Sequence, residues 1–322
     1  MAIKMPRYIM NVFKDKDLFE EAAAIKNINA AFVEKDWYAV QVLKKIHEFS
    51  YPDFEIIFSG GTALSKAHGI IQRFSEDLDF RIQTNVLGTE SKSQQRKILS
   101  GFKNALIAHL RTEFTIEDHK IKPRDGNRFF SIELDYPTLY LQSDALRPHL
   151  LIEFKLSPLI MDAQVFSVAS FINELSKKTA EVQDIACTNS IEIAVDKLSA
   201  LIWRIPQREE EIKNGIEDSD GRNMVRHLHD LYFLHEVAIR HHDFKPLVLR
   251  IIQQDDNRAK SITGLDVKEK FSIVLGILKK DSKYAQEYDQ FVKGMSYAAG
   301  SPPEYKEVLA IFERLAAHVL AQ

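Results

Sequence analysis

The sequence predicts an α+β fold, in which a mixed sheet flanked by helices is followed by an all-helical C-terminal lobe. Short apolar or alternating segments, typical of strands, lie between residues 54 and 156. Segments with apolar residues at three- and four-residue steps, typical of helices, flank them and dominate the chain after residue 191. The length of 322 residues is enough for two domains, which we expect at 1–185 and 186–322.

The first lobe is expected to begin with helices and then to alternate strands with helices. The helices are expected at 15–50, 62–71 and 91–113. The strands are expected at 54–59, 77–82, 114–121, 128–136 and 148–156. Gly60 and Gly61 predict a turn after the first strand, and "PRDG" (123–126) predicts a hairpin turn. The segment 160–190 shows no clear pattern.

The second lobe is expected to consist of helices. They are expected at 191–204, 222–238, 243–255, 267–280, 283–292 and 303–320. The polar segment 204–223 contains Pro and Gly and is expected to be a loop between the first two helices. Within it, "QREEEIKNG" (207–215) is expected to be solvated, with a lid or a partner contact as the alternative.

The bulk composition limits the class of protein. The net charge of −3 gives no global signal for nucleic acid, so a nucleic acid would need a local basic surface. The single cysteine, Cys187, excludes an intramolecular disulfide and suits a reducing cytoplasm. Charges occur too early for a signal peptide, and no apolar run reaches the roughly 20 residues of a membrane helix. We therefore expect a cytoplasmic protein with no membrane partner.

Two aspartates at alternate positions end the stretch "IFSGGTALSKAHGIIQRFSEDLDF" (57–80). Residues i and i+2 of a strand point to the same side, so Asp77 and Asp79 project together. Their mutual repulsion needs an opposite charge. Mg²⁺ prefers oxygen ligands and takes one or two protein carboxylates together with substrate phosphates. The spacing therefore predicts a divalent metal site, for Mg²⁺ or Mn²⁺.

The glycine turn before these aspartates suits a phosphate group. Gly60 and Gly61 lie between a strand and a helix, where free backbone N–H groups bind phosphate and glycine permits close approach. Together with the aspartates, the turn predicts a nucleoside-triphosphate site. A third carboxylate would complete it as a metal ligand or a base. Glu153 is the first candidate, and the pair Glu133 and Asp135 is the alternative.

Several charged residues allow two interpretations each. Lys66, one turn into the short helix, reaches a triphosphate or is simply solvated. Arg73 contacts phosphate or pairs with Glu76 or Asp77. Lys197, on an otherwise apolar helix, neutralises phosphate charge or extends along the surface to water. Asp230 belongs to an exposed ion-pair ladder with Arg222 and Arg226, or it positions Lys197.

The stretch 57–80 resembles the signature of the AbiEii/AbiGii toxin family of nucleotidyltransferases, which belongs to the DNA polymerase β-like superfamily. That signature has the form Gly-Gly-Thr-Ala-Leu-x-Lys, followed by Arg-x-Ser-x-Asp-Leu-Asp-Phe. The matching residues are Gly60, Gly61, Thr62, Lys66, Arg73, Ser75, Asp77 and Asp79. In addition, "AVDKLSALIWR" (194–204) resembles the lysine motif of the family and "RHLHDLYFL" (226–234) its later aspartate motif. Lys197 and Asp230 take these positions, and His227 stands where an acidic residue is frequent.

The resemblance implies a Mg²⁺-dependent transfer of a nucleoside monophosphate from an NTP to an acceptor, with RNA and in particular the tRNA 3′ end as the expected acceptor. It implies that the metal is held by Asp77 and Asp79. The residues expected to bind the NTP are Gly60, Gly61, Thr62, Lys66, Arg73 and Ser75. Lys197 and Asp230 are expected to complete the catalytic set.

The family also implies biological partners. The chain is expected to be the toxin of a type IV-like toxin–antitoxin or abortive-infection system, with a cognate antitoxin that acts at DNA or on the acceptor pathway. Two alternatives stay open. One is a regulator that binds GTP or another NTP without transfer, and the other is an enzyme that transfers the NMP to a protein.

Overall fold

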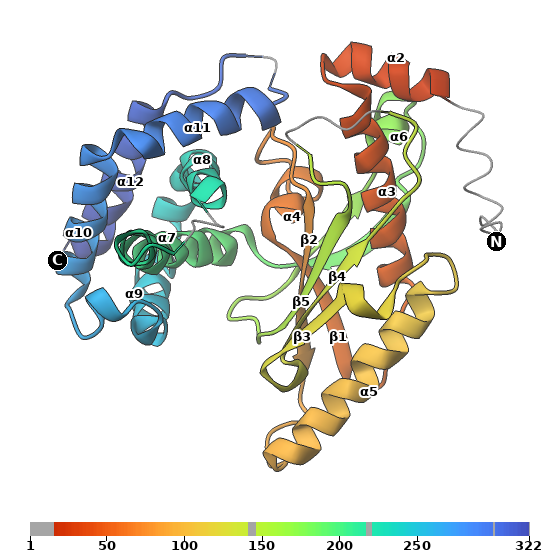
Figure 1. Cartoon of the computed structure of the whole chain (residues 1–322), viewed down its shortest axis with the longest axis horizontal. Helices are drawn as coiled ribbons and strands as arrows, with labels where there is room; N and C mark the ends of the chain where they lie inside the picture. The colour runs from red at the N-terminus through yellow and green to blue at the C-terminus, as the bar shows by residue number, and fades with distance from the viewer. Residues whose placement is uncertain (1–15, 141–145, 217–220, 299, 322) are drawn as a thin grey trace. The chain divides into compact units, whose positions relative to one another are not determined.

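The computed structural model describes residues 16–140, 146–216, 221–298 and 300–321 (Figure 1). The chain divides into two compact units. The first contains Met1–Gly69 and Phe74–Thr188, and the second contains Ile70–Arg73 and Asn189–Gln322. The predicted α+β class is confirmed, because the first unit holds a mixed seven-stranded sheet with helices and the second is built from helices.

The sheet of the first unit has the strand order β3-β4-β5-β2-β1-β7-β6. Its strands are β1 (Phe54–Ser59), β2 (Asp77–Thr84), β3 (Ile121–Arg124), β4 (Phe129–Leu134), β5 (Leu150–Leu156), β6 (Gln164–Val168) and β7 (Val182–Cys187). Neighbouring strands are antiparallel except for two parallel pairs, β2 with β5 and β1 with β7. The expected strands at 54–59, 77–82, 128–136 and 148–156 are confirmed.

Helices cover the sheet of this unit. They are α2 (Lys16–Lys26), α3 (Ala30–His47), α4 (Gly60–Lys66), α5 (Lys92–Leu110) and α6 (Phe171–Leu175), with 3₁₀ turns η1 (Asp118–Lys120) and η2 (Asp125–Asn127). Side-chain caps at Asn29 and Ser91 start α3 and α5, because each accepts a bond from a free backbone N–H of the first turn. Helix α4 begins at the glycines of the expected turn and ends at Lys66, earlier than expected.

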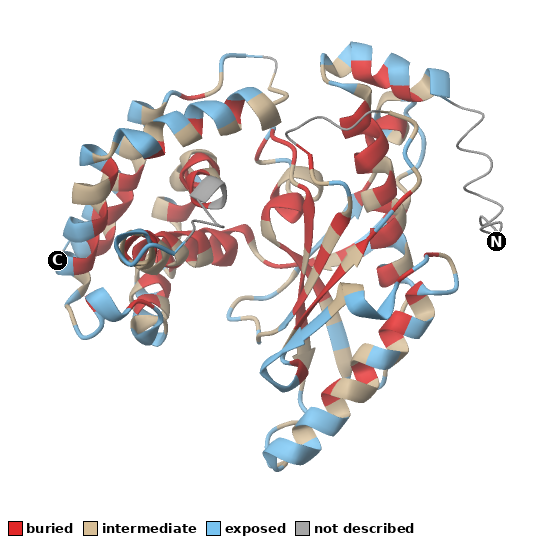
Figure 2. Cartoon of the chain, viewed as in Figure 1, coloured by how far each residue is buried: buried red, intermediate tan, exposed pale blue. Residues whose placement is uncertain are grey.

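The core of the first unit lies on one face of the sheet. Leu78 and Phe80 of β2 and Phe154 of β5 belong to one buried cluster with Tyr38 of α3 and Phe102 of α5. Figure 2 shows these elements buried on their facing sides. The alternation of side chains along a strand sends the intervening residues of β2, Asp77 and Asp79 among them, to the opposite face.

The second unit consists of helices that pack against one another, with α7 in contact with α8, α9 and α10, and α8 in contact with α11 and α12. The helices are α7 (Ser190–Lys213), α8 (Gly221–Arg240), α9 (Phe244–Gln254), α10 (Val267–Lys280), α11 (Ser282–Met295) and α12 (Tyr305–Leu320), with 3₁₀ turns η3 (Asp256–Arg258) and η4 (Lys260–Ile262). The short segment 70–73 joins this unit. Gln72 accepts a backbone bond from Tyr297, and Arg73 forms a β-bridge with Ser296.

Two sequence expectations about secondary structure are wrong. The segment 114–121 is not a strand, although Phe114 and Ile116 are buried. The carbonyl of Ile116 accepts two hydrogen bonds from the Arg111 side chain. The alternation of apolar and polar residues in this segment therefore reflects the burial of side chains and not pairing with a neighbouring strand. The paired strand, β3, starts at Ile121.

The expected loop 204–223 is also helical in its first half, because α7 continues through Pro206 to Lys213. The buried Arg208 forms an ion pair with Glu287, which anchors this part of the helix, so 207–213 is not a solvated loop. Residues 217–220 of the expected loop lie outside the described residues, as does the N-terminal segment 1–15. A search of the described helices finds none that is long and apolar enough to cross a membrane.

Candidate active site

Three carboxylates lie on the same face of the sheet. Asp77 and Asp79 alternate along β2, and Asp79 is the register partner of Glu153 on the parallel neighbour β5. Register partners in a sheet point to the same face, as do residues i and i+2 of one strand. This set of hard oxygen donors fits Mg²⁺, which favours carboxylates.

The structure separates the candidates for the third carboxylate. Glu133 also lies on this face, but its carboxylate pairs with Lys122 of β3. Asp135 follows the end of β4 and pairs with Lys120. Glu153 is the candidate adjacent to Asp79, so the arrangement favours Glu153.

The position of the Asp79 side chain requires a glycine at position 60. Gly60 has a φ of 75°, in the region that L-residues with side chains rarely adopt. A Cβ at this position would come within 2.8 Å of the Asp79 side chain. Ser59, the preceding residue, is the register partner of Asp79, which explains the close approach. The glycine predicted to admit a phosphate is therefore also the residue that makes room for a predicted metal ligand.

Thr62 connects the glycine turn to the aspartate strand. Its buried hydroxyl donates a hydrogen bond to the backbone carbonyl of Asp77. The contact joins α4 to the first residue of β2, so this hydroxyl has a protein partner where we expected a phosphate. Ser75 is half-buried in the segment that leads into β2.

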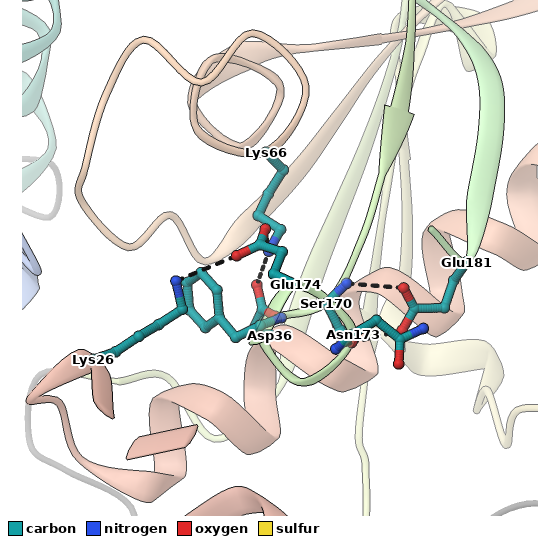
Figure 3. Close-up of polar contacts among 8 residues, drawn as sticks. Lys26, Asp36, Lys66, Ser170, Asn173, Glu174 and Glu181 are labelled. Carbon is teal, nitrogen blue, oxygen red and sulfur yellow. Dashed lines mark hydrogen bonds and ion pairs between the residues drawn. The ribbon is translucent and has the colours of Figure 1, made fainter. Parts of the chain in front are cut away.

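Lys66 also has protein partners (Figure 3). Its Nζ lies 2.9 Å from Asp36 Oδ1 and 3.1 Å from Glu174 Oε1, and the side chains of Lys66 and Asp36 are each 5% exposed. The ammonium also lies 4.0 Å from the centre of the Phe171 ring. Burial alone would lower the pKa of Lys66, but Asp36 and Glu174 raise it, so the lysine remains charged. The solvated interpretation is wrong, and the contacts favour a role in holding α4 against α3 and α6.

One site residue was missed by the sequence reasoning. Arg147, in the segment before β5, places Nη1 2.5 Å from Asp77 Oδ1. Its backbone N–H donates to Glu76, whose carboxylate also pairs with the buried Lys35. A single arginine before a proline carries no periodic or motif signal, so sequence patterns could not have identified it.

The second unit contains a buried charge cluster around Asp230, which is 0% exposed. Arg73 donates from Nε to Oδ1 and from Nη2 to Oδ2, both at 2.7 Å. Lys197 Nζ lies 2.7 Å from Oδ2. Burial would raise the pKa of Asp230, but the two cations outweigh it and hold this pKa far below its usual range. This carboxylate is therefore ionised at any physiological pH.

These contacts correct two interpretations. Arg73 forms an ion pair with the buried Asp230. Lys197 is buried, so it does not extend along the surface to water, and Asp230 is no member of an exposed ladder.

The surroundings of this cluster are positively charged. His227 lies on α8 between Arg226 and Asp230 in sequence. Burial, followed by the charges of Lys197, Arg204 and Arg226, lowers its pKa well below the ordinary value. The imidazole is thus neutral, and it cannot supply the negative charge of an acidic residue at this position.

A family model agrees with the sequence signature. The family model described as "Nucleotidyl transferase AbiEii toxin, Type IV TA system" matches residues 42–311. A search of curated proteins finds no match. Among solved structures, the chain is similar to MenT4, a nucleotidyltransferase toxin from Mycobacterium tuberculosis, with 16% identity, coverage of 93% of this chain and 98% of that chain, and a TM-score of 0.47. It is also similar to JHP933 from Helicobacter pylori, with 17% identity, coverage of 81% and 92%, and a TM-score of 0.37.

Proposed function

The chain belongs to the family of AbiEii nucleotidyltransferase toxins of type IV toxin–antitoxin systems, and from this premise we propose that it transfers a nucleoside monophosphate from an NTP to RNA, with the 3′ end of tRNA as the acceptor. The observation that carries the proposal is the alignment of Asp77, Asp79 and Glu153 on one face of the sheet. A protein that only bound a nucleotide would not need three aligned carboxylates.

We assign the metal ligands to Asp77 and Asp79. Both are presented by β2 and their oxygens are donors that Mg²⁺ or Mn²⁺ accepts. A bound divalent cation would supply positive charge to the phosphates and lower the pKa of the attacking hydroxyl. Glu153 is our candidate for the group that accepts the proton, since it is the register partner of Asp79.

The proposed reaction is a displacement at the α-phosphorus. The acceptor hydroxyl forms a new O–P bond, its proton passes to a carboxylate, and the bond to the β-phosphate breaks to release pyrophosphate. The backbone of Gly60 and Gly61 is proposed to bind the triphosphate, together with Ser75. Thr62 and Lys66 are proposed to hold the turn in place, which is supported by their protein contacts.

Lys197 and Asp230 of the second unit are proposed to belong to the catalytic set. We propose that Lys197 contributes positive charge to a loose phosphoryl-transfer transition state. Asp230 is proposed to orient Lys197 and Arg73, a role supported by its ion pairs with both.

RNA as the acceptor is supported by a basic segment in the first unit. Residues 92–128 contain nine Lys or Arg and four Asp or Glu, although the whole chain has a net charge of −3. Much of α5 and β3 is exposed in Figure 2. Lys103 and Arg111 line a cavity of about 340 Å³ together with Asp118, which pairs with Arg111. A surface of this kind binds a phosphate backbone through counterion release.

The proposal is tested by transfer of label. The protein is incubated with each α-labelled NTP, Mg²⁺ and either total RNA or cell protein, with Asp77→Ala and Asp79→Ala as controls. We expect label in RNA with wild type and none with either variant. Label that persists in both variants contradicts the catalytic assignment. Label in protein contradicts the RNA acceptor, and nucleotide binding without transfer points to a regulator.

The antitoxin remains part of the proposal. The family implies a cognate antitoxin, which we propose acts at DNA or on the acceptor pathway. Growth of cells that express this chain, with and without a candidate antitoxin, tests this part of the proposal.

A further inference from the structure

Arg147 places a positive charge on the carboxylates that are proposed to bind metal. Its Nη1 lies 2.5 Å from Asp77 Oδ1. The side chain of Arg147 is 31% exposed and that of Asp77 is 11% exposed, so the guanidinium keeps contact with solvent while the aspartate is largely buried. The cation thus occupies an oxygen that the proposed metal site requires.

The backbone of Arg147 is fixed independently of this contact. Its N–H donates to Glu76 Oε1 at 2.6 Å, and its carbonyl accepts from Lys35 Nζ at 2.8 Å. Lys35 and Glu76 also pair with each other at 2.5 Å, and their side chains are 0% and 9% exposed. Pro148 follows directly and restricts the chain further. The side chain can therefore change its rotamer without any shift of the backbone.

The electrostatic environment explains why a cation rests there. Asp77 is adjacent to Glu76 in sequence and shares a sheet face with Asp79 and Glu153. Burial opposes the charge of Arg147, but Asp77, Glu76 and Glu153 raise its pKa above the ordinary value. The guanidinium offsets the repulsion among these carboxylates, which is the task that a divalent cation performs when it binds.

We propose that Arg147 is a nucleotide-binding residue whose guanidinium pairs with Asp77 and moves to a phosphate oxygen when the metal–NTP complex binds. This inference rests on the proposed function. A guanidinium and a divalent cation repel each other at the same carboxylate, so binding of the metal weakens the contact with Asp77. The released guanidinium has a strong alternative partner, because its planar donors match the oxygens of a phosphate.

A purely structural role for this ion pair is less consistent with the contacts. The anchoring of the segment is already supplied by Lys35 and Glu76, which are both buried. The guanidinium of Arg147 takes no part in that anchoring, because the contacts with Lys35 and Glu76 are made by its backbone carbonyl and N–H. Its position on a proposed metal ligand is therefore better explained by a function in ligand binding.

The test measures metal and nucleotide binding separately from activity. Mn²⁺ binding without nucleotide is followed by electron paramagnetic resonance for wild type, Arg147→Met, Arg147→Lys and Asp77→Asn. Binding of a fluorescent NTP analogue with Mg²⁺ is measured for the same proteins. Circular dichroism and urea unfolding establish that each variant is folded. If Arg147→Met is unstable, the conservative variant Arg147→Lys replaces it in both binding measurements.

We expect Arg147→Met to bind Mn²⁺ several-fold more tightly than wild type, because the competing cation is gone. We expect the same variant to bind the nucleotide roughly 10-fold more weakly, the scale of one charged hydrogen bond. For both ligands, the affinity of Arg147→Lys should lie between those of wild type and Arg147→Met, since lysine keeps the charge and lacks the planar guanidinium.

The outcomes distinguish this inference from the function on which it rests. Mn²⁺ binding that is unchanged or weaker in Arg147→Met, with Asp77→Asn defective, overturns the inference alone and makes Arg147 a residue that merely positions Asp77. Mn²⁺ binding by Asp77→Asn that equals wild type overturns the proposed metal site itself, and the inference with it.

Discussion

The Asp79 carboxylate fills the space that a side chain at Gly60 would occupy. Any Cβ at position 60 would lie within 2.8 Å of Asp79, and the φ of 75° is itself unfavourable for other residues. The glycine turn and the aspartate strand are therefore one structural unit, and neither can change without the other.

The first prediction concerns this contact. Gly60→Ala should lower stability by more than the roughly 1–2 kcal/mol of a positive φ alone and should strongly reduce transfer, because Asp79 must move. Gly264→Ala is the matched control, since its φ of 78° is similar and a Cβ there meets no atom within 4 Å. Urea unfolding and the label-transfer assay measure both effects. Equal losses of stability in the two variants, with transfer unaffected by Gly60→Ala, would contradict the role of the contact.

The second prediction distinguishes the candidates for the third carboxylate. Glu153→Gln should reduce transfer roughly 100-fold or more, the scale for loss of a general base, because Glu153 is the register partner of Asp79 and our candidate for the proton acceptor. Glu133→Gln should have little effect, since Glu133 pairs with the exposed Lys122 on the edge strand. Initial rates at saturating NTP measure the difference. The reverse ranking would reassign the third carboxylate to Glu133.

The third prediction concerns the buried lysine of the signature. Lys66→Met leaves the buried Asp36 without its main cation and should cost about 3–5 kcal/mol of unfolding free energy. Lys16→Met removes an ion pair whose side chains are 56% and 53% exposed and should cost at most about 1 kcal/mol. The double variant Lys66→Met/Asp36→Asn should regain part of the loss.

The double variant also separates the two roles of Lys66. If Lys66 holds α4 in place, nucleotide affinity should recover together with stability. Recovered stability with poor nucleotide binding would show instead that the ammonium binds the triphosphate.

The fourth prediction concerns pH. Burial lowers the pKa of His229 from its ordinary 6.5 to about 4, and its Nδ1 lies 3.1 Å from the Tyr288 hydroxyl. Between pH 6.5 and 4 the unfolded chain binds the proton and the folded chain does not, so stability falls as the pH falls through this window. The loss is about 3 kcal/mol for this residue. Urea unfolding of wild type and His229→Phe across this window should show a shallower fall in the variant, and parallel curves would refute the assignment.

The fifth prediction concerns the RNA acceptor. The charge reversals Arg96→Glu and Lys97→Glu, on the exposed side of α5, should weaken RNA binding and make it less dependent on salt. NTP affinity should stay unchanged. Lys268→Glu reverses an exposed charge on α10 of the second unit and serves as the control. An equal effect of Lys268→Glu on RNA binding would show that net charge alone is responsible.

Much of the first unit could be predicted from local patterns. The strands with Asp77 and Glu153 alternate in sequence, and this pattern alone indicates which side chains share a face. The pattern fails at 114–121, because Phe114 and Ile116 are buried without a strand ladder. It also fails after Pro206, where tertiary contacts of Arg208 support a helix that a proline usually ends.

The sequence by itself determined the family, the order of most elements and the placement of Asp77 and Asp79 on one side of a strand. These features depend on motifs and strand periodicity, which are local. The tertiary structure alone decided the partners of the charged residues. Lys66 pairs with Asp36, and Arg73 and Arg147 find carboxylates 157 and 70 residues away. A buried charge requires an opposite charge nearby in space, and no local pattern in a sequence records which distant residue will supply it.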